Sequence, residues 1–219
     1  MIQPRPFAFT LIELLVIMAI IAILAALIFP ATRAVVATRT KHRARAELKE
    51  VESSIDIYKA ELNFYPPSST DGSSANPLYY ELSGTRLNNG VYVTLDGNAS
   101  LPASDVFIAF GVDGFANCTK GTSTDDEQPK VKSYTKGALR QGQFLQAAIT
   151  NLALHASTRA VVLGTQLQGV SMLAGAITPY GYNSATPTNN PNSYDLWLDI
   201  LVGGAPVRVC NWNSKPIKL

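Results

Sequence analysis

The sequence has few charged residues. Asp, Glu, Lys and Arg make up 16% of its 219 residues, against about 25% in typical soluble domains. The net charge is only +2, which gives no strong positive field for a polyanion, so no nucleic-acid partner is expected. The sequence holds two cysteines and two histidines. These side chains are too few, and the cysteines too far apart, for a structural zinc site.

Apolar residues are concentrated near the amino terminus. Over residues 9–31, 20 of 23 residues are apolar, and the exceptions are Thr10, Glu13 and Pro30. At a rise of about 1.5 Å per residue, such a helix covers the roughly 30 Å hydrocarbon layer of a bilayer. A core helix would have a polar face, and a cleaved secretory signal would have a shorter apolar run with a small-residue cleavage site. The run therefore predicts a transmembrane helix over residues 9–31.

Glu13 is the one acidic residue of this run. A carboxylate inside a membrane helix costs about 2.5–3.5 kcal/mol on insertion scales, so it needs a partner. The run itself contains no Lys, Arg or His. Cleavage between Ala8 and Phe9 would create a positively charged amine four residues before Glu13. In a bundle of such helices, the amine of one chain would meet the Glu13 carboxylate of a neighbour.

The segment FTLIELL, residues 9–15, resembles the amino-terminal signature of type IV pilins and of type II secretion pseudopilins. The resemblance also covers the short leader and Pro30 near the outer end of the apolar helix. It implies that a prepilin peptidase cuts on the cytoplasmic side between Ala8 and Phe9 and methylates the new amine. It also implies that Glu13 and Pro30 act in assembly. The family usually has Gly where this sequence has Ala8, another small residue.

Beyond Pro30 the pattern becomes that of an amphipathic helix over residues 32–65. Its apolar side chains recur at steps of four and three residues. They are Ala44, Leu48, Val51, Ile55, Tyr58 and Leu62. The stripe is too short for a coiled coil, so we expect it to pack on a sheet. Pro66 and Pro67 would stop the helix, and Pro30 would make a pliable joint within it.

The carboxyl-terminal part contains short β-like runs separated by Gly, Pro and Asn. They cover residues 177–183, 194–202 and 206–212. The sequence thus predicts an α+β, pilin-like fold: a long amino-terminal helix, apolar in its membrane half and amphipathic in its outer half, packed on a carboxyl-terminal antiparallel β-sheet. The elements Tyr-Pro-Pro at 65–67 and Tyr-Asp-Leu at 194–196 resemble the major pseudopilins in particular.

The middle of the chain, residues 66–176, reads as a variable insertion. Residues 91–95 and 106–110 resemble strands, apolar positions over 139–152 suggest a helix, and 119–137 resembles a polar loop. The expected segments are a leader at 1–8, a transmembrane and filament-core helix at 9–31, an amphipathic helix at 32–65, the insertion at 66–176 and the carboxyl-terminal strands at 177–219.

Signals for catalysis are weak. Ser133 and Lys136 have the S-x-x-K spacing of some acyl-transfer enzymes, but no companion motif accompanies them. His155 lies in an apolar stretch without a nearby Ser or Cys motif. We expect no enzyme activity and no catalytic residue.

The sequence leaves two questions open: whether a carboxyl-terminal loop binds calcium, and whether the two cysteines form a disulfide. The resemblance implies a calcium ion in a carboxyl-terminal loop, for which Asp195 and Asp199 are weak candidate ligands, and turn-forming Asn residues are the alternative reading of that loop. Cys118 and Cys210 would form a disulfide or remain two buried thiols, because the compartment outside the inner membrane permits either.

The resemblance as a whole implies a structural subunit of a pilus-like filament, first of all the major pseudopilin of a type II protein secretion system. A type IV pilin for adhesion or motility is the alternative, and a membrane-anchored periplasmic domain is the alternative of another class. The expected partners are membrane lipid, the prepilin peptidase, an inner-membrane assembly platform and identical subunits in a helical filament.

The expected location is the inner membrane, as a single-pass protein with a periplasmic carboxyl-terminal domain, and afterwards an extracytoplasmic filament. Basic residues follow the apolar run between Arg33 and Arg45, which by the positive-inside rule favours the reverse orientation. We give the processing signature more weight than this distribution of basic residues, because cleavage requires a cytoplasmic leader.

Overall fold

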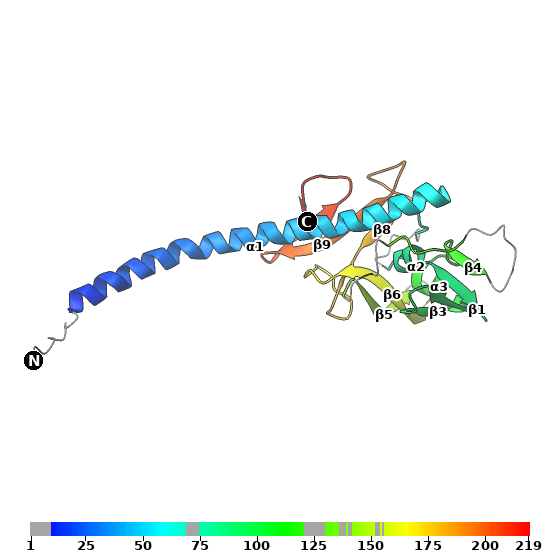
Figure 1. The fold of residues 1–219 in the computed structure, drawn as a ribbon, viewed down its shortest axis with the longest axis horizontal. Helices are drawn as coiled ribbons and strands as arrows, with labels where there is room; N and C mark the ends of the chain where they lie inside the picture. Colours follow the sequence, from blue (N-terminus) through cyan, green and yellow to red (C-terminus); the bar gives the residue numbers. More distant parts are fainter. Residues whose placement is uncertain are drawn as a thin grey trace, which may run out of the picture. The chain divides into compact units, whose positions relative to one another are not determined.

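Figure 1 shows the computed structural model of the chain. It describes residues 10–68, 75–120, 130–135, 139, 142–151, 154 and 156–219, without the side chains of 27–33 and 120. The chain divides into two compact units, unit 1 (Met1–Thr40) and unit 2 (Lys41–Leu219). Helix α1, Leu11–Leu62, contributes its first part to unit 1 and its last part to unit 2.

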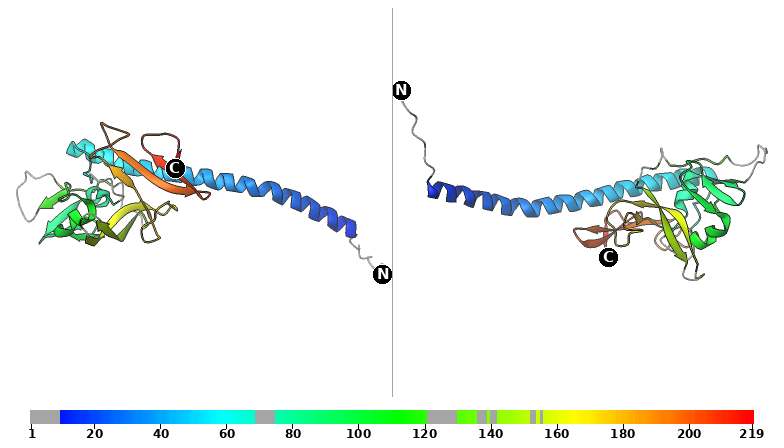
Figure 2. Two further views of the ribbon diagram at one scale, coloured as in Figure 1. Left: turned by 180° about the vertical axis from the view of Figure 1, so that it is seen from behind. Right: turned by 90° about the horizontal axis from the view of Figure 1, so that it is seen from below.

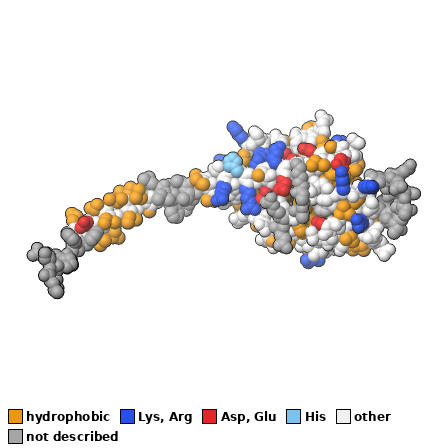
Figure 3. Space-filling view, in the orientation of Figure 1, with side chains coloured by type: hydrophobic (Ala, Val, Ile, Leu, Met, Phe, Trp, Pro, Cys, Tyr) orange, Lys and Arg blue, Asp and Glu red, His pale blue; other side chains and the backbone are white. Residues whose placement is uncertain are grey.

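In unit 1 the helix has an entirely apolar stretch from Leu14 to Ala26. All described side chains from Leu11 to Ala26 are exposed, and Leu11 is 81% exposed. Figure 3 accordingly shows mainly hydrophobic side chains, with one acidic patch, on the visible face of the described amino-terminal part of α1. The described part of unit 1 contains no second element that would bury them. A helix that is hydrophobic all round and uncovered needs an apolar partner outside the chain.

In unit 2 the helix has one buried stripe. Ala44, Leu48, Ile55 and Tyr58 are fully buried, which confirms the predicted amphipathic periodicity. The helix ends at Leu62, before the two prolines, because the next residue, Asn63, takes a left-handed conformation with φ 64°. Its N–H bonds to the carbonyl of Lys59 at 2.9 Å, which is the usual way for a helix to satisfy its last carbonyls.

The carboxyl-terminal sheet lies along this part of α1. The views of Figures 1 and 2 agree on the placement. Its order is β11-β10-β9-β8, all antiparallel. The strands are β8 (Gly181–Asn183), β9 (Asp195–Val202), β10 (Ala205–Cys210) and β11 (Ile217–Lys218). The strands predicted at 194–202 and 206–212 are confirmed as β9 and β10, and so is the α+β fold. The single run predicted at 177–183 is wrong, because it is divided into β7 (Thr178–Pro179), which belongs to another sheet, and β8.

Buried side chains alternate with more exposed ones along β9 and β10, and this explains why one face of the sheet packs on the helix. Leu196, Leu198 and Ile200 are fully buried, as is Val209 of the neighbouring strand. Successive side chains of a strand point to opposite faces, so these residues share one face. Arg45 of α1 links the helix to the end of β10 and the residues that follow it. Its guanidinium donates to the carbonyl of Cys210 and, at 2.6 Å, to that of Asn213.

The insertion and the first residues after it fold into two further sheets and two short helices, because strand β7 (Thr178–Pro179) lies beyond the predicted insertion boundary at residue 176. One sheet has the order β3-β2-β1-β4 and the other β5-β6-β7. The strands are β1 (Thr85–Asn88), β2 (Val91–Thr94), β3 (Ser100–Pro102), β4 (Cys118–Lys120), β5 (Phe144–Asn151), β6 (Ala156–Thr165) and β7 (Thr178–Pro179). The helices are α2 (Leu78–Ser83) and α3 (Ala103–Phe110). The predicted strand at 91–95 is confirmed as β2.

Two predictions for the insertion are wrong. Residues 106–110 belong to helix α3 instead of a strand: Val106, Ala109 and Phe110 are buried at helical spacing. The helix expected over 139–152 is strand β5 in its described part, because residues 144–151 pair along their whole length with β6. The polar loop expected at 119–137 begins inside β4, and residues 121–129 lie outside the described residues.

Candidate functional site

The first described turn of the chain joins Thr10 to Glu13. Glu13 N donates to the Thr10 hydroxyl oxygen at 3.3 Å, and the Thr10 hydroxyl donates to Glu13 Oε2 at 3.3 Å. Thr10 N also approaches Glu13 Oε2, at 3.5 Å. Threonine and glutamate at this spacing form a capping box, which satisfies amide donors that a helix leaves open at its start.

The capping box holds the Glu13 side chain at the start of the helix. The Glu13 carboxylate bends back toward the start of α1, which is the end of the helix where a negative charge is favoured. Ala8 and Phe9, the expected cleavage pair, lie outside the described residues. Thr10 is a residue that the sequence reasoning missed, and the T-x-x-E spacing is the signal that would have found it.

Between Leu14 and Ala26 the helix bears apolar side chains and no charge. Ile12 is 72% exposed and Met18 64%. In the part of the chain that the structure describes, no helix combines the length and the apolar character needed to cross a membrane. The predicted span runs to residue 31, and the side chains of 27–31 lie outside the described residues.

Position 30 lies within helix α1. The Pro30 side chain is among those that the structure does not describe. The pliable joint expected there stays a prediction, as does the role of Pro30 in assembly.

The candidate calcium ligands Asp195 and Asp199 both have other partners. Asp199 forms a two-pronged ion pair with Arg208, with Nε to Oδ1 and Nη2 to Oδ2 both at 2.7 Å. Asp195 is 2% exposed and accepts N–H groups of the preceding loop. Calcium takes about six to eight oxygen ligands. Among the described residues, no group of three or more His, Cys, Asp or Glu side chains is placed to hold a metal, so these two carboxylates do not fit the ion.

The two cysteines lie in different sheets. Cys118 begins β4 and its Sγ contacts the carbonyl of Thr119 at 3.4 Å, whereas Cys210 ends β10 and is buried. Both side chains are thiols in the structure. Burial raises the pKa of the Cys210 thiol above its ordinary value. A raised thiol pKa lowers the thiolate fraction and hence the reactivity of this side chain.

Of the residues considered for catalysis in the sequence, Ser133 is within the described residues. Ser133 Oγ lies 2.8 Å from Thr135 Oγ1. Lys136 and His155 are outside the described residues. The S-x-x-K pattern therefore stays a sequence motif.

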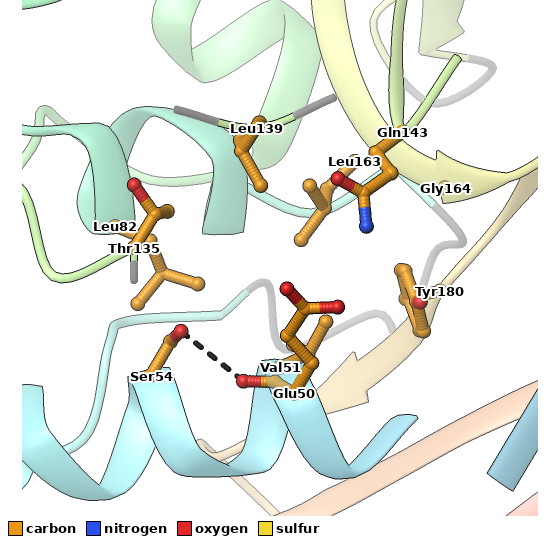
Figure 4. Close-up of a pocket in the computed structure, with 10 residues that line it drawn as sticks. All are labelled: Glu50, Val51, Ser54, Leu82, Thr135, Leu139, Gln143, Leu163, Gly164 and Tyr180. Atoms are coloured by element: carbon orange, nitrogen blue, oxygen red, sulfur yellow. Dashed lines mark hydrogen bonds between the residues drawn. The ribbon is translucent and has the colours of Figure 1, made fainter. Parts of the chain in front are cut away.

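A small cavity lies between α1 and the insertion (Figure 4). Its volume is about 20 Å³, room for about one water molecule and far below the roughly 300–1,000 Å³ of a substrate site. Ser54 lines it but donates to the carbonyl of Glu50 at 3.2 Å. A second hollow, of about 140 Å³, adjoins Trp197 and Asp199.

Comparison with known proteins finds one match, which lies at the amino terminus. No curated protein and no solved structure is similar to the chain. Residues 5–29 match the prokaryotic N-terminal methylation motif. The matched segment contains Thr10 and Glu13, the two residues of the capping box. The chain therefore carries, at its amino terminus, the signature of a type IV pilin-like prepilin.

Proposed function

We propose that this chain is a non-enzymatic subunit of a pilus-like filament. The observation that carries the proposal is the methylation motif at residues 5–29. A prepilin peptidase would cut between Ala8 and Phe9 and methylate the new amine. The chain would wait in the inner membrane as a single-span protein, and its carboxyl-terminal domain would lie in the periplasm.

Assembly would then transfer the apolar helix from lipid to a bundle of identical helices. The exposed side chains from Leu11 to Ala26 support this step, because they leave a continuous apolar surface that the described part of unit 1 does not cover. Lipid and helix bundle are both apolar, so burial alone gives no register between neighbours. Glu13 would supply the register by pairing with the Phe9 amine of an adjacent subunit.

Within this class we propose the major pseudopilin of a type II secretion system. The Tyr-Pro-Pro and Tyr-Asp-Leu elements support that assignment. A type IV pilin is the second candidate, and the size of the insertion favours it, since two sheets and two helices are added between α1 and the carboxyl-terminal sheet. Deletion of the gene separates the two: loss of protein secretion supports the pseudopilin, and loss of surface fibres or motility supports the pilin.

The processing step is tested by mass spectrometry of the mature protein. We expect the native polypeptide to begin with N-methylated Phe9. A chain that retains Met1 would overturn the proposal.

Assembly is tested with variants of the capping box. Glu13→Ala should still insert in the membrane but should form few or no filaments in a complementation assay. Thr10→Ser is the matched control, because it keeps a hydroxyl at the start of α1 and should assemble normally. Thr10→Ala keeps the acid and removes the cap, so it separates the electrostatic role of Glu13 from helix capping. Normal filament growth by Glu13→Ala would contradict the proposed pairing.

A further inference from the structure

The loop between β8 and β9 is wrapped around one carboxylate. Oδ2 of Asp195 accepts the backbone N–H of Thr188 at 2.9 Å and that of Asn189 at 3.0 Å. Oδ1 accepts the backbone N–H of Asn190 at 2.9 Å. Successive backbone N–H groups that converge in this way form a nest, an arrangement that binds anions. Here the bound anion is a side chain of the same protein.

Two side chains also donate hydrogen bonds to the Asp195 carboxylate. The Asn189 amide nitrogen donates to Asp195 Oδ2 at 3.0 Å, and the Thr188 hydroxyl donates to the same atom at 3.3 Å. A carboxylate offers about four lone-pair sites. With these donors and 2% exposure, the Asp195 carboxylate is surrounded by the positive ends of N–H and O–H dipoles. A cation placed there would face those same positive ends.

The side chain of Asn211, the residue that follows β10, also holds the loop. Asn211 Oδ1 accepts the N–H of Leu196 at 3.0 Å and the side-chain amide of Asn190 at 3.2 Å. The Asn211 amide donates to the carbonyl of Tyr194 at 2.9 Å. The backbone on both sides of Asp195 is therefore held by an amide that carries no charge.

We infer that the Asp195 carboxylate is the internal anion on which the β8–β9 loop folds, and that this loop needs no metal ion. In a calcium loop several carboxylates and carbonyls converge on a cation. In this loop the polarity is reversed, because donors converge on one carboxylate. The remaining candidate, Asp199, is neutralised by Arg208 and takes no part in the loop. The inference is independent of the proposed function, since it concerns how unit 2 is ordered.

The direct test is hydrogen exchange of the full chain in detergent, followed by mass spectrometry of peptides that cover residues 184–194. We expect the amides of Thr188, Asn189 and Asn190 to be protected equally in millimolar EDTA and in millimolar calcium chloride. Protection that is lost in EDTA and restored by calcium would overturn the inference. This measurement needs no variant, so it decides the question even if substitutions at the site prevent folding.

Substitutions on β9 then test whether the Asp195 carboxylate is the group that orders the β8–β9 loop. Asp195→Asn puts an NH2 group against the N–H donors and should lose most of the loop protection, with a fall in melting temperature of about 5 °C or more. Asp199→Asn is the matched control: it lies on the same strand and breaks the pair with Arg208, and it should leave the protection of 184–194 unchanged. Unchanged protection in Asp195→Asn, or a calcium-induced rise in wild-type melting temperature that this variant abolishes, would contradict the inference.

Discussion

The hydroxyl of Tyr58 on α1 donates a hydrogen bond of 2.9 Å to Oε2 of Glu81 on α2. Both side chains are fully buried. Glu81 also accepts the N–H of Ala116 at 2.8 Å and that of Asn117 at 2.9 Å. One carboxylate thus joins the long helix, a short helix and the segment before β4. It attaches the insertion to the helix on which the carboxyl-terminal sheet also packs.

Removal of the Tyr58 hydroxyl should weaken this attachment. Tyr58→Phe deletes one hydrogen bond to a buried carboxyl group and leaves that group one donor short, so we expect the free energy of unfolding to fall by about 1–3 kcal/mol. Tyr65→Phe is the matched control, because its hydroxyl is half-buried and accepts from Ser193 at 3.3 Å; its cost should be about 0.5–1 kcal/mol. Urea unfolding measures both. Equal losses in the two variants would refute a special role for the Tyr58–Glu81 bond.

The buried carboxyl of Glu81 should make stability depend on pH. Burial raises the pKa of Glu81 above its ordinary value of 4.5, although hydrogen bonds from Asn117, Ala116 and Tyr58 act in the opposite direction. The folded protein therefore binds this proton more tightly than the unfolded chain does. The contribution of Glu81 is fully present below pH 4.5 and is lost as the pH rises through the raised pKa.

This dependence is isolated by comparison with Glu81→Gln, which cannot titrate at this position. The difference in unfolding free energy between wild type and variant should shift in favour of the variant as the pH rises from the ordinary glutamate pKa toward neutrality. Urea unfolding at a series of pH values gives the difference. A constant difference would show that the Glu81 pKa is not raised by folding.

A close contact in the carboxyl-terminal sheet requires glycine at position 181. A Cβ atom on Gly181 would lie 2.0 Å from Cε2 of Trp197, its cross-strand neighbour. Gly181→Ala should therefore cost about 1–3 kcal/mol by overpacking. In a Trp197→Ala background the same substitution should cost little, because the indole is gone. A double-mutant cycle by thermal unfolding measures this coupling, and additive effects would contradict the proposed contact.

The packing of the sheet on α1 should depend on Leu198. Leu198 is fully buried, so Leu198→Ala should lower the free energy of unfolding by about 2–5 kcal/mol through lost burial and a cavity. Val170→Ala is the control, because Val170 is 53% exposed and its truncation should change stability by no more than about 0.5 kcal/mol. Denaturant unfolding compares the two, and a small loss in Leu198→Ala would show that this face is loosely packed.

Regular patterns in the sequence predicted the elements whose burial repeats at short range. The stripe from Ala44 to Tyr58 is confirmed, because helical spacing brings those positions to one face whatever they pack against. The strand alternation at Leu196, Leu198 and Ile200 is confirmed for the same kind of reason.

The insertion was harder to predict because its patterns are short. Residues 106–110 are too few for a periodicity to separate strand from helix, and they form the end of α3. Residues 144–151 form β5 because β6 provides a complete antiparallel partner. That partner follows later in the chain, so the local composition did not reveal the pairing.

The sequence by itself determined the amino-terminal chemistry, since an acid, a capping threonine and an apolar run act through neighbours a few residues away along one helix. Only the tertiary structure decided what the buried carboxylates of Glu81 and Asp195 do. Glu81 accepts from amides 35 and 36 residues further along the chain, and the β8–β9 loop is held by Asn211, which follows β10 and accepts from Asn190. The state of a carboxylate depends on the donors that surround it, and folding brings those donors together.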